Sequence, residues 1–379
     1  MKPKIRFKGF DDAYFENTFS QLFNTISDSG HNVSSNEYCK RGAYPVIDQS
    51  KDYIVGYTDA IAPIIPKGGI IVFGDHTREL KYVDFPFCTG ADGTQLLSPK
   101  SKDIPMYLYY YCKSLKIPNT GYNRHFKYIK ETIYKIPLST KEQQAIASFF
   151  DNLDSQISAS ASRIASLKQI KAGSLQAMFP QEGETVPKVR FKGFKGEWKK
   201  VKLGNIFCER NESNINGEML SVTQRNGIIK ASENGRFDNS NSDKSNYKVV
   251  KVGDIAYNSM RMWQGASGYS PYEGIVSPAY TVIIPQEGIY SPFFAYLFKN
   301  ENIINTFRLH SQGLTSDTWN LKFPAFSKIE ILFPEDAEMK EQQKIAVYFT
   351  SLDRQITLHS QRLEKLKQIK AACLDKMFV

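Results

Sequence analysis

The chain contains one long amphipathic segment twice, and this duplication restricts its possible folds more than any other feature. Residues 141–179 align without a gap on residues 340–378, and 21 of the 39 positions are identical. A second similar pair, PKIRFKGF at 3–10 and PKVRFKGF at 187–194, lies upstream of each copy. Self-similarity at a fixed separation indicates a repeated structural unit. The sequence therefore predicts a tandem repeat whose units consist of a short head, a middle segment and a helical tail.

The two middle segments show little similarity to each other. The heads are 184 residues apart and the tails 199 apart, so the second middle segment is 15 residues longer than the first. Both contain short β-branched and aromatic runs that Gly, Pro and Asp interrupt, which is typical of strands and turns. We therefore predict two α+β domains that differ in sequence on a duplicated helical scaffold.

Each tail is predicted to form one helix, roughly 55–60 Å long at 1.5 Å per residue. Its apolar residues recur at steps of three and four, which places them in a single stripe. The other copy of the helix is the simplest cover for so long a stripe, and the product would be a two-stranded coiled coil. The alternative is that each helix packs on its own domain. The residues expected at the helix–helix contact are Ile146, Phe150, Leu153, Ile157, Ile164 and Leu167, with Ile345, Phe349, Leu352, Ile356, Leu363 and Leu366 in the second copy.

The predicted architecture is thus two α+β domains separated by two long, mutually antiparallel helices, related by an internal pseudo-twofold repeat. The expected boundaries are 1–139 for the first domain, 140–180 for the central helix, 181–337 for the second domain and 338–379 for the C-terminal helix.

The net charge and the spacing of the cysteines limit the expected binding partners and the expected cellular compartment. A net charge of +10 favours polyanions such as nucleic acid or an anionic membrane surface. The N-terminal residues lack the apolar run of a signal peptide, and no run of about 18 apolar residues could span a bilayer. The five cysteines are scattered, without the spacing of metal ligands. We expect a cytoplasmic protein with reduced thiols and no structural zinc.

The sequence lacks the motifs of common catalytic sites. It has no G-x-x-x-x-G-K-[ST] phosphate loop, no strand-linked G-x-G-x-x-G and no N-P-P-Y-like run that would hold a flipped base. A G-x-S-x-G elbow and an H-E-x-x-H pair are also absent, and the five histidines are dispersed. We therefore predict a non-enzymatic protein with no catalytic residue and no metal ligand.

Both middle segments carry groups of residues suited to contacts with bases and phosphates. Arg can donate two hydrogen bonds to guanine, Asn and Gln can pair with adenine, and hydroxyl groups suit phosphates. In the first segment the candidates are His76, Thr77, Arg78, Lys81, Tyr82, Tyr122, Asn123, Arg124, His125 and Lys127. In the second they are Asn258, Ser259, Arg261, Trp263, Gln264, Ser311, Gln312, Thr315, Ser316 and Trp319.

Two different groups of this kind on one helical spacer suggest a bipartite, asymmetric site on double-stranded DNA. Each domain would read one half of the site, and the helices would set the distance between the halves. Recognition of single strands or RNA relies more on stacking aromatics along a channel, for which rigid spacers are less suited.

The whole chain resembles the specificity (S) subunit of type I restriction–modification systems. The resemblance rests on the repeated PK(I/V)RFKGF head, the repeated KEQQ-IA…LD-QI…LKQIKA helix, YPVIDQSKDYIVGYTDA, FGDHTRELKY and TGADGTQLL in the first middle segment, and YNSMRMWQGASG…GIVSPAY in the second. It implies two target recognition domains. By the same resemblance, the bases would be read by loops 74–82 and 120–128 in the first domain and by loops 257–265 and 311–319 in the second.

The resemblance also implies the partners. Two modification (M) subunits would dock on the helices, bind S-adenosylmethionine and methylate adenine, and restriction (R) subunits would add ATP-driven translocation and cleavage. This chain itself would bind no cofactor, since S-adenosylmethionine, ATP and Mg belong to partner subunits, and it would have no membrane partner. One departure concerns the first head, which continues DDAYFENTFSQLF where the second has KGEWKKVKLGNIF, so an irregular start of the first domain is expected.

Two other functions compete with this hypothesis. A stand-alone duplicated DNA-binding regulator would dimerise through its helices and bind a specific site alone. A fused restriction–methylation enzyme would need motor, nuclease and methylase segments, which the sequence lacks.

Overall fold

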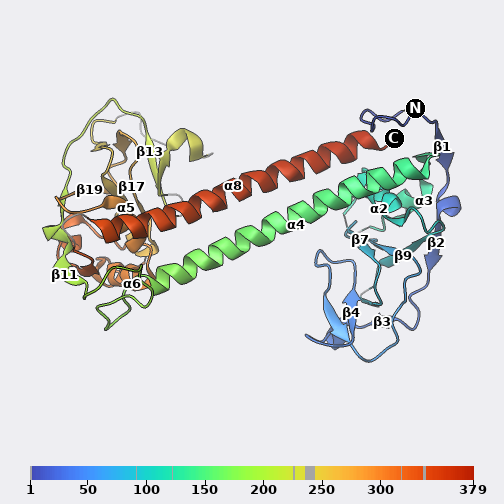
Figure 1. Cartoon of the computed structure of the whole chain (residues 1–379), viewed down its shortest axis with the longest axis horizontal. Coiled ribbons are helices and arrows are strands. Elements are labelled where there is room, and N and C mark those ends of the chain that lie inside the picture. The colour runs from blue at the N-terminus through green and yellow to red at the C-terminus, as the bar shows by residue number, and fades with distance from the viewer. Residues whose placement is uncertain are drawn as a thin grey trace. The chain divides into compact units, whose positions relative to one another are not determined.

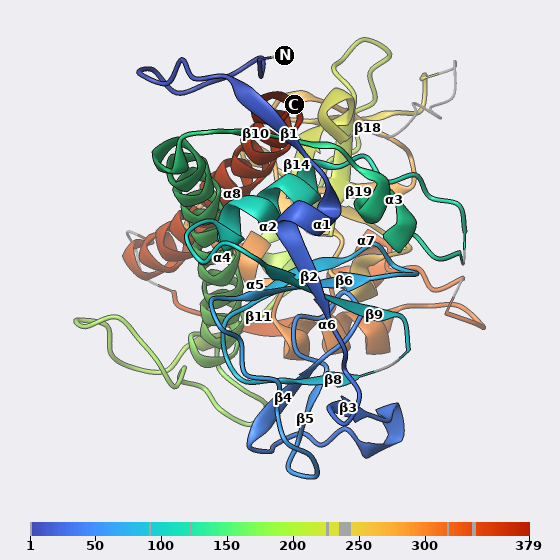
Figure 2. The same cartoon turned by 90° about the vertical axis from the view of Figure 1, so that its right-hand side faces the viewer.

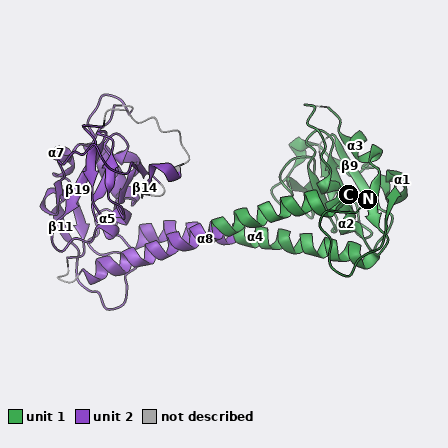
Figure 3. Cartoon of the chain, turned by 90° about the horizontal axis from the view of Figure 1, so that it is seen from above, with its two compact units in different colours: residues 1–161, 360–379 green, residues 162–359 purple. Residues whose placement is uncertain are grey.

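The computed structural model describes residues 2–90, 92–121, 123–224, 227–234, 244–316, 318–335 and 339–379. The chain divides into two compact units, one of residues 1–161 with 360–379 and one of residues 162–359 (Figure 3). Two helices of 38 residues, α4 (Thr140–Ala177) and α8 (Lys340–Met377), each contribute one part to each unit (Figure 1). Among the described residues, no helix has the length and apolar character that a membrane span requires.

The first unit contains two small sheets and a two-stranded ladder. One sheet has the antiparallel order β2-β9-β6-β7, and the other has the order β3-β8-β4-β5, in which β8 pairs in parallel with β3 and β4. In Figure 2 the helices α1 and α2 lie on one side of the first sheet, and the second sheet lies on the other side. The strands are β1 (Tyr14–Asn17), β2 (Phe23–Ile26), β3 (Asn32–Val33), β4 (Tyr44–Ile47), β5 (Gly56–Thr58), β6 (Ile70–Gly74), β7 (Leu80–Val83), β8 (Cys88–Gly90), β9 (Thr94–Pro99) and β10 (Tyr134–Pro137), and the short helices are α1 (Phe19–Leu22), α2 (Pro105–Ser114) and α3 (Phe126–Glu131).

The second unit repeats the main sheet of the first. Its order is β12-β19-β16-β17, again antiparallel, and β11 pairs with β20 as β1 pairs with β10. The two domains therefore share one frame although their sequences show little similarity. The strands are β11 (Lys199–Lys202), β12 (Phe207–Glu209), β13 (Leu220–Thr223), β14 (Gly227–Lys230), β15 (Lys248–Val250), β16 (Ile255–Asn258), β17 (Ser267–Tyr269), β18 (Gly274–Val276), β19 (Tyr280–Pro285) and β20 (Glu330–Phe333), and the helices are α5 (Ser291–Leu297), α6 (Glu301–His310) and α7 (Phe323–Phe326).

The expected irregular start of the first domain is not found. Both domains begin with a strand, one helical turn and a second strand, formed by β1, α1 and β2 in the first and by β11, residues 203–205 and β12 in the second. In the first domain Gln21 accepts a hydrogen bond from the Thr18 amide at 2.7 Å, which supports the start of α1. The altered sequence DDAYFENTFSQLF thus supplies its own helix signal.

The head segments explain why PK(I/V)RFKGF occurs twice. Arg6 donates two hydrogen bonds to the buried carboxylate of Glu142, at 2.7 and 2.8 Å, and Arg190 donates two to Glu341, both at 2.7 Å. The backbone amide of Ile5 donates to Lys376 at the end of α8, and that of Val189 donates to Ala177 at the end of α4. Each head therefore joins the first turn of one long helix to the last turn of the other.

The ends of the long helices lie in the cores of the two units. Phe378 contacts Tyr111 and Phe150 in the first unit, with ring centroids 5.3 and 5.7 Å apart. At the equivalent position, Phe179 contacts Phe293 and Phe349 in the second unit, at 5.7 and 5.9 Å. Burial of such large aromatic side chains stabilises both junctions.

The apolar stripes of the helices pack both on the domains and along the other long helix, so both arrangements considered from the sequence occur together. Ile146, Phe150 and Leu153 lie in the core that α2 and the first main sheet form, and Ile345, Phe349 and Leu352 lie in the core of the second unit. Further along, Leu167 and Ile356 join the same second core, and Leu366 packs against the first. The remaining stripe positions, Ile157, Ile164 and Leu363, are half-buried or buried. Each helix thus packs first on the domain that precedes it and then continues along its partner.

Candidate nucleic-acid interface

In the first unit, three loops meet around Gln49. The loop after β6 contributes His76, whose backbone amide donates to Gln49 Oε1 at 3.2 Å, and Thr77, whose hydroxyl donates to the Gln49 carbonyl at 2.5 Å. Gln49 Nε2 donates to the carbonyl of Asp92 at 2.7 Å. Gln49 therefore fixes three loops at one edge of the main sheet. It is a residue that the sequence reasoning missed, although it lies in YPVIDQS directly after β4.

The second predicted loop of this unit is attached to the first through Asp75. The buried ring of His125 contacts the Asp75 carbonyl through Nδ1 at 2.8 Å, and the amide of Phe126 donates to Asp75 Oδ1 at 2.7 Å. His125 Nε2 lies 3.2 Å from the hydroxyl of Thr120. The structure thus brings residues 74–79 together with residues 120–121 and 123–128, as a single surface of the domain requires.

Several predicted contact residues of the first unit point into the protein instead. Lys81 is buried and donates to the backbone carbonyls of Asp48, at 2.8 Å, and Asp52. Its burial lowers the pKa of Lys81, and both of these carbonyls lie inside the protein. Tyr82 packs against Tyr109, and the fully buried His125 holds the loop. Direct DNA contact by Lys81 and His125 disagrees with the structure, because both side chains are buried, and strand β7 alternates its side chains so that Lys81 turns towards the core. Tyr82 is half-buried, and its contact with DNA stays a prediction.

Arg78 is held in an uncommon backbone conformation. Its φ is +64°, a region that residues other than glycine seldom adopt, and its Nη1 donates to the carbonyl of Ile117 at 3.2 Å. Of the remaining candidates that the structure describes, His76 is half-buried, and Thr77, Asn123, Arg124 and Lys127 are exposed. Tyr122 lies outside the described residues.

In the second unit, the two predicted loops pack against each other through tryptophan. Trp263 and Trp319 meet edge to face with ring centroids 5.2 Å apart. The amide of Leu321 donates to the carbonyl of Ser259 at 2.8 Å, which joins the residue after the second loop to the residue after β16. Residues 258–265, 311–316 and 318–320 therefore form one surface.

Some of these side chains serve the loops themselves. The buried hydroxyl of Ser259 lies 2.8 Å from that of Thr281, Asn258 Oδ1 accepts from the Met260 amide at 3.0 Å, and Ser311 donates to Phe307 at 2.8 Å. Gln264, which is half-buried, accepts a hydrogen bond at its carbonyl from Gln224 at 2.7 Å. The exposed candidates on this surface are Arg261, Gln312, Thr315 and Ser316.

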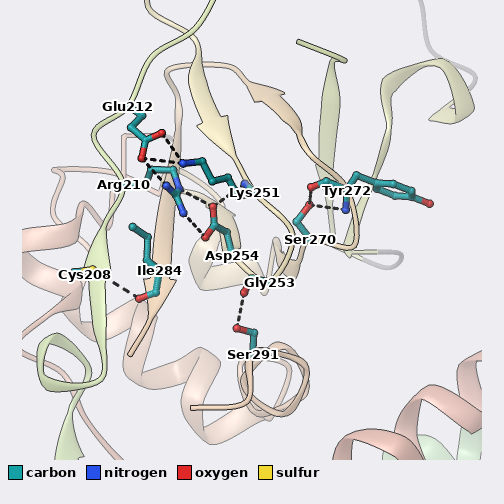
Figure 4. Close-up of polar contacts among 10 residues, drawn as sticks. All are labelled: Cys208, Arg210, Glu212, Lys251, Gly253, Asp254, Ser270, Tyr272, Ile284 and Ser291. Carbon is teal, nitrogen blue, oxygen red and sulfur yellow. Dashed lines mark hydrogen bonds and ion pairs between the residues drawn. The ribbon is translucent and has the colours of Figure 1, made fainter. Parts of the chain in front are cut away.

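A buried ion pair fixes the strand that carries the first of these loops. The guanidinium of Arg210 donates to both carboxylate oxygens of Asp254, at 2.7 and 2.9 Å, directly before β16 (Figure 4). Glu212 accepts from Arg210 at 2.7 Å and from Lys251, and Ser291 at the start of α5 donates to the Gly253 carbonyl at 2.5 Å. These contacts hold one end of β16, and the loop at 258–265 follows its other end.

The described residues contain no group of three or more His, Cys, Asp and Glu side chains that could hold a metal ion. All five cysteines are free thiols.

Comparison with known proteins found one matching family model and several similar solved structures. A family model described as "Type I restriction modification DNA specificity domain" matches residues 18–169 and again residues 195–368. Among solved structures, the chain is similar to a type I restriction-modification system S subunit from M. genitalium, with 17% sequence identity, coverage of 100% of this chain and 99% of that chain, and a TM-score of 0.64. It also matches the HsdS subunit from Thermoanaerobacter tengcongensis, with 13% identity, 97% coverage of both chains and a TM-score of 0.45. No curated protein sequence matches.

Proposed function

This chain belongs to the family of type I restriction modification DNA specificity domains, and from that premise we propose that it is the subunit that selects the DNA site for a methyltransferase complex. Each α+β domain would read one half of a bipartite, asymmetric site on double-stranded DNA. The long helices would set the distance between the halves.

The observation that carries this proposal is that the two domains share one sheet topology but present different side chains on equivalent loops. The main sheets have the same strand order, and both domains place their two candidate loops side by side. The side chains on the two surfaces differ, with Asn123 and Arg124 in the first and Arg261 and Gln312 in the second. Since base contacts specify sequence, different side chains on equivalent loops imply different half-sites.

The exposed candidates are the residues that we assign to DNA contact. They are Thr77, Asn123, Arg124 and Lys127 in the first domain, and Arg261, Gln312, Thr315 and Ser316 in the second, with Trp263 and Trp319 as the packed base of that surface. The net charge of +10 would favour approach to DNA.

The docking surfaces for two M subunits would lie on the helices. Several exposed side chains are identical in the two copies, among them Gln169 and Gln368, and Ile170 and Ile369. Ile170 borders an apolar hollow of about 390 Å³ that Val189, Phe191 and Tyr348 also line. Two copies of one surface suit two copies of one partner.

Catalysis would belong to these partners. We propose that the chain binds no cofactor itself, and that S-adenosylmethionine, ATP and Mg are bound by M and R subunits of the complex. A cytoplasmic location is part of the same proposal, because a DNA-selecting subunit works where the DNA and its partner subunits are.

Methylation mapping tests this function. The chain is expressed with the M subunit encoded next to it, and methyladenine is mapped across the host genome. We expect a two-part motif with a fixed gap, and replacement of residues 257–265 by the loop of another family member should change one half only. A continuous motif, methylation without this chain, or a change in both halves would contradict the proposal. Specific binding by the purified chain alone, as a dimer, would instead favour a stand-alone regulator.

A further inference from the structure

Lys299 lies between α5 and α6, and its ammonium group is surrounded by backbone carbonyls. It donates to the carbonyl of Gln224 at 3.0 Å, to that of Ser267 at 2.8 Å, and to that of Gly265. An ammonium group has three N–H donors and no acceptor. In the charged form all three donors are therefore used inside the protein, and none remains for a phosphate or a base.

The three carbonyls belong to segments that shape the surface of the second domain formed by the loops at 258–265 and 311–316, which we call the second reading surface. Gly265 closes the loop at 258–265, with φ of +76°, and Ser267 starts β17 directly after it. Gln224 follows β13 and donates through its side chain to the carbonyl of Gln264 at 2.7 Å. Lys299 thus joins the end of the reading loop to a neighbouring hairpin.

The backbone at Lys299 is itself fixed. Phe298 is fully buried and contacts Phe307 and Phe326, with ring centroids 5.3 and 5.9 Å apart. Asn300 caps α6 by accepting from the Asn302 amide at 3.0 Å and donates to the carbonyl of Leu175 at 2.7 Å. A side chain anchored in this way can hold the loops in place, because its own position has little freedom.

The first domain has a lysine at the equivalent place. Tyr110 donates to Asp154 at 2.9 Å and Tyr296 donates to Asp353 at 3.0 Å, which aligns α2 with α5. Lys113 and Lys299 each follow their tyrosine by three residues. Burial lowers the pKa of Lys113, while Asp154 and Glu79 raise it, and Glu79 belongs to the first domain's loop at 74–82.

We propose that Lys299 is a positioning residue for the second reading surface: it holds the loops at 224 and 264–267 in the geometry that reads the second half-site, without contacting DNA. The inference rests on the proposed function, since it concerns how that site is read. Lys299 resembles an ordinary charged residue at a helix end, so the sequence alone gives no sign of this role.

The test compares the complex of this chain with its M subunit in wild-type form and with Lys299→Met. Methionine has a similar length but no donor, so the three carbonyls lose their partner while the buried charge is also removed. We expect the methylated motif to keep its first half-site, and we expect the number of different sequences methylated at the second half-site to rise at least 10-fold. Lys328→Met, an exposed lysine of the same domain, is the matched control and should leave the motif unchanged.

Hydrogen exchange of the same complexes separates positioning from general loss of structure. In Lys299→Met, exchange should rise at residues 223–224, 227 and 264–268 and stay unchanged in α8. If this variant does not assemble, Lys299→Arg replaces it, because a planar guanidinium cannot reproduce the three-carbonyl geometry and should also relax the second half-site. An unchanged motif and unchanged exchange in the variant that assembles would overturn the inference. If the wild-type complex gave no bipartite motif, the proposed function itself would fail.

Discussion

Lys171 on α4 lies with its Nζ 2.6 Å from Asp353 Oδ1 on α8, and the same contact occurs a second time. Lys370 forms an ion pair with Asp154, and each residue of this second pair is 199 positions from its counterpart. The lower-numbered residue of one helix pairs with the higher-numbered residue of the other, so the helices run antiparallel. The same ion pair thus occurs once in each half of the tandem repeat, and each copy aligns the two helices in the same register.

We expect this pair to contribute measurable coupling between the helices. Both side chains are partly exposed, so solvent screening limits the coupling energy to about 0.5–1 kcal/mol. Opening free energies from hydrogen exchange of α4 and α8 would be measured for Lys171→Ala, Asp353→Ala and the double variant, in complex with the M subunit. Tyr296→Phe, which removes the hydroxyl that contacts Asp353 and Thr350 but keeps both partners of the ion pair, is the control. Additive effects of the two alanine variants would show that the pair does not fix the register.

Arginine substitutions on the two surfaces should act on separate halves of the DNA site. Arg124→Ala is expected to weaken discrimination in the first half only, and Arg261→Ala in the second half only. A bidentate contact to a base is worth about 1–3 kcal/mol, so discrimination should fall roughly 5- to 150-fold at one position of the motif. The measurement is competitive binding of the methyltransferase complex to DNA with single changes in each half.

Lys81→Met is the contrasting variant for this experiment. Its ammonium group binds the carbonyls of Asp48 and Asp52, so its loss should lower the stability of the first unit rather than change one base preference. A selective change at one base in Lys81→Met would contradict the inward position of this residue. A loss in both halves for Arg124→Ala or Arg261→Ala would contradict the separate surfaces.

Sequence reasoning found the parts of the fold that depend on local pattern. The stripe of Ile146, Phe150 and Leu153 has helical spacing, and its repetition 199 residues later made the tandem architecture evident. The confirmed fold class rests on these local and repeated signals. The common strand order of the two domains was not visible, because β pairing joins segments far apart in the chain and tolerates many different side chains.

The candidate sites were harder to predict because side-chain direction depends on tertiary contacts. Lys81 and His125 lie in segments rich in polar residues, yet both side chains are buried. Lys81 faces inwards because β7 alternates its side chains, and His125 faces inwards because its ring contacts the Asp75 carbonyl. Gln49 and Lys299 carry no motif, and their importance comes from the loops that they join. Composition selected the candidate loops, whereas the direction of each side chain depends on tertiary contacts that only the structure shows.

A charged residue in the duplicated helix surface should reduce the number of bound M subunits. Ile170→Glu is expected to change the stoichiometry from two M subunits to one, because it places a carboxylate beside the apolar hollow, and Ile369→Glu should do the same through the other copy. Native mass spectrometry of the co-purified complex gives the count. Ala165→Glu is the control, since the second copy already has Glu364 at that exposed position. Two bound M subunits in both isoleucine variants would place the docking surface elsewhere.

The stability of the second unit should depend on pH through Lys299. Burial lowers the pKa of Lys299 from 10.5 to about 7, with Lys171 acting in the same direction and Asp353 in the opposite one. Between these two values the unfolded chain binds more protons at this group than the folded chain does, so its contribution to the unfolding free energy rises with pH. Lys299→Met cannot titrate, and it lacks this rise.

Tryptophan fluorescence can follow this effect in the second unit alone, because Trp198, Trp263 and Trp319 are the three tryptophans of the chain and all lie there. Urea unfolding of the full-length chain would be measured from pH 7 to 9 for the wild type and Lys299→Met. Groups that do not interact with Lys299 titrate alike in both proteins and cancel in the difference. We expect the wild type to gain stability relative to the variant by at most about 1.4 kcal/mol per pH unit, since one pKa unit corresponds to that free energy. Parallel pH profiles would show that Lys299 keeps an ordinary pKa, and a relative loss with rising pH would show that the three carbonyls hold the charged form more strongly than burial opposes it.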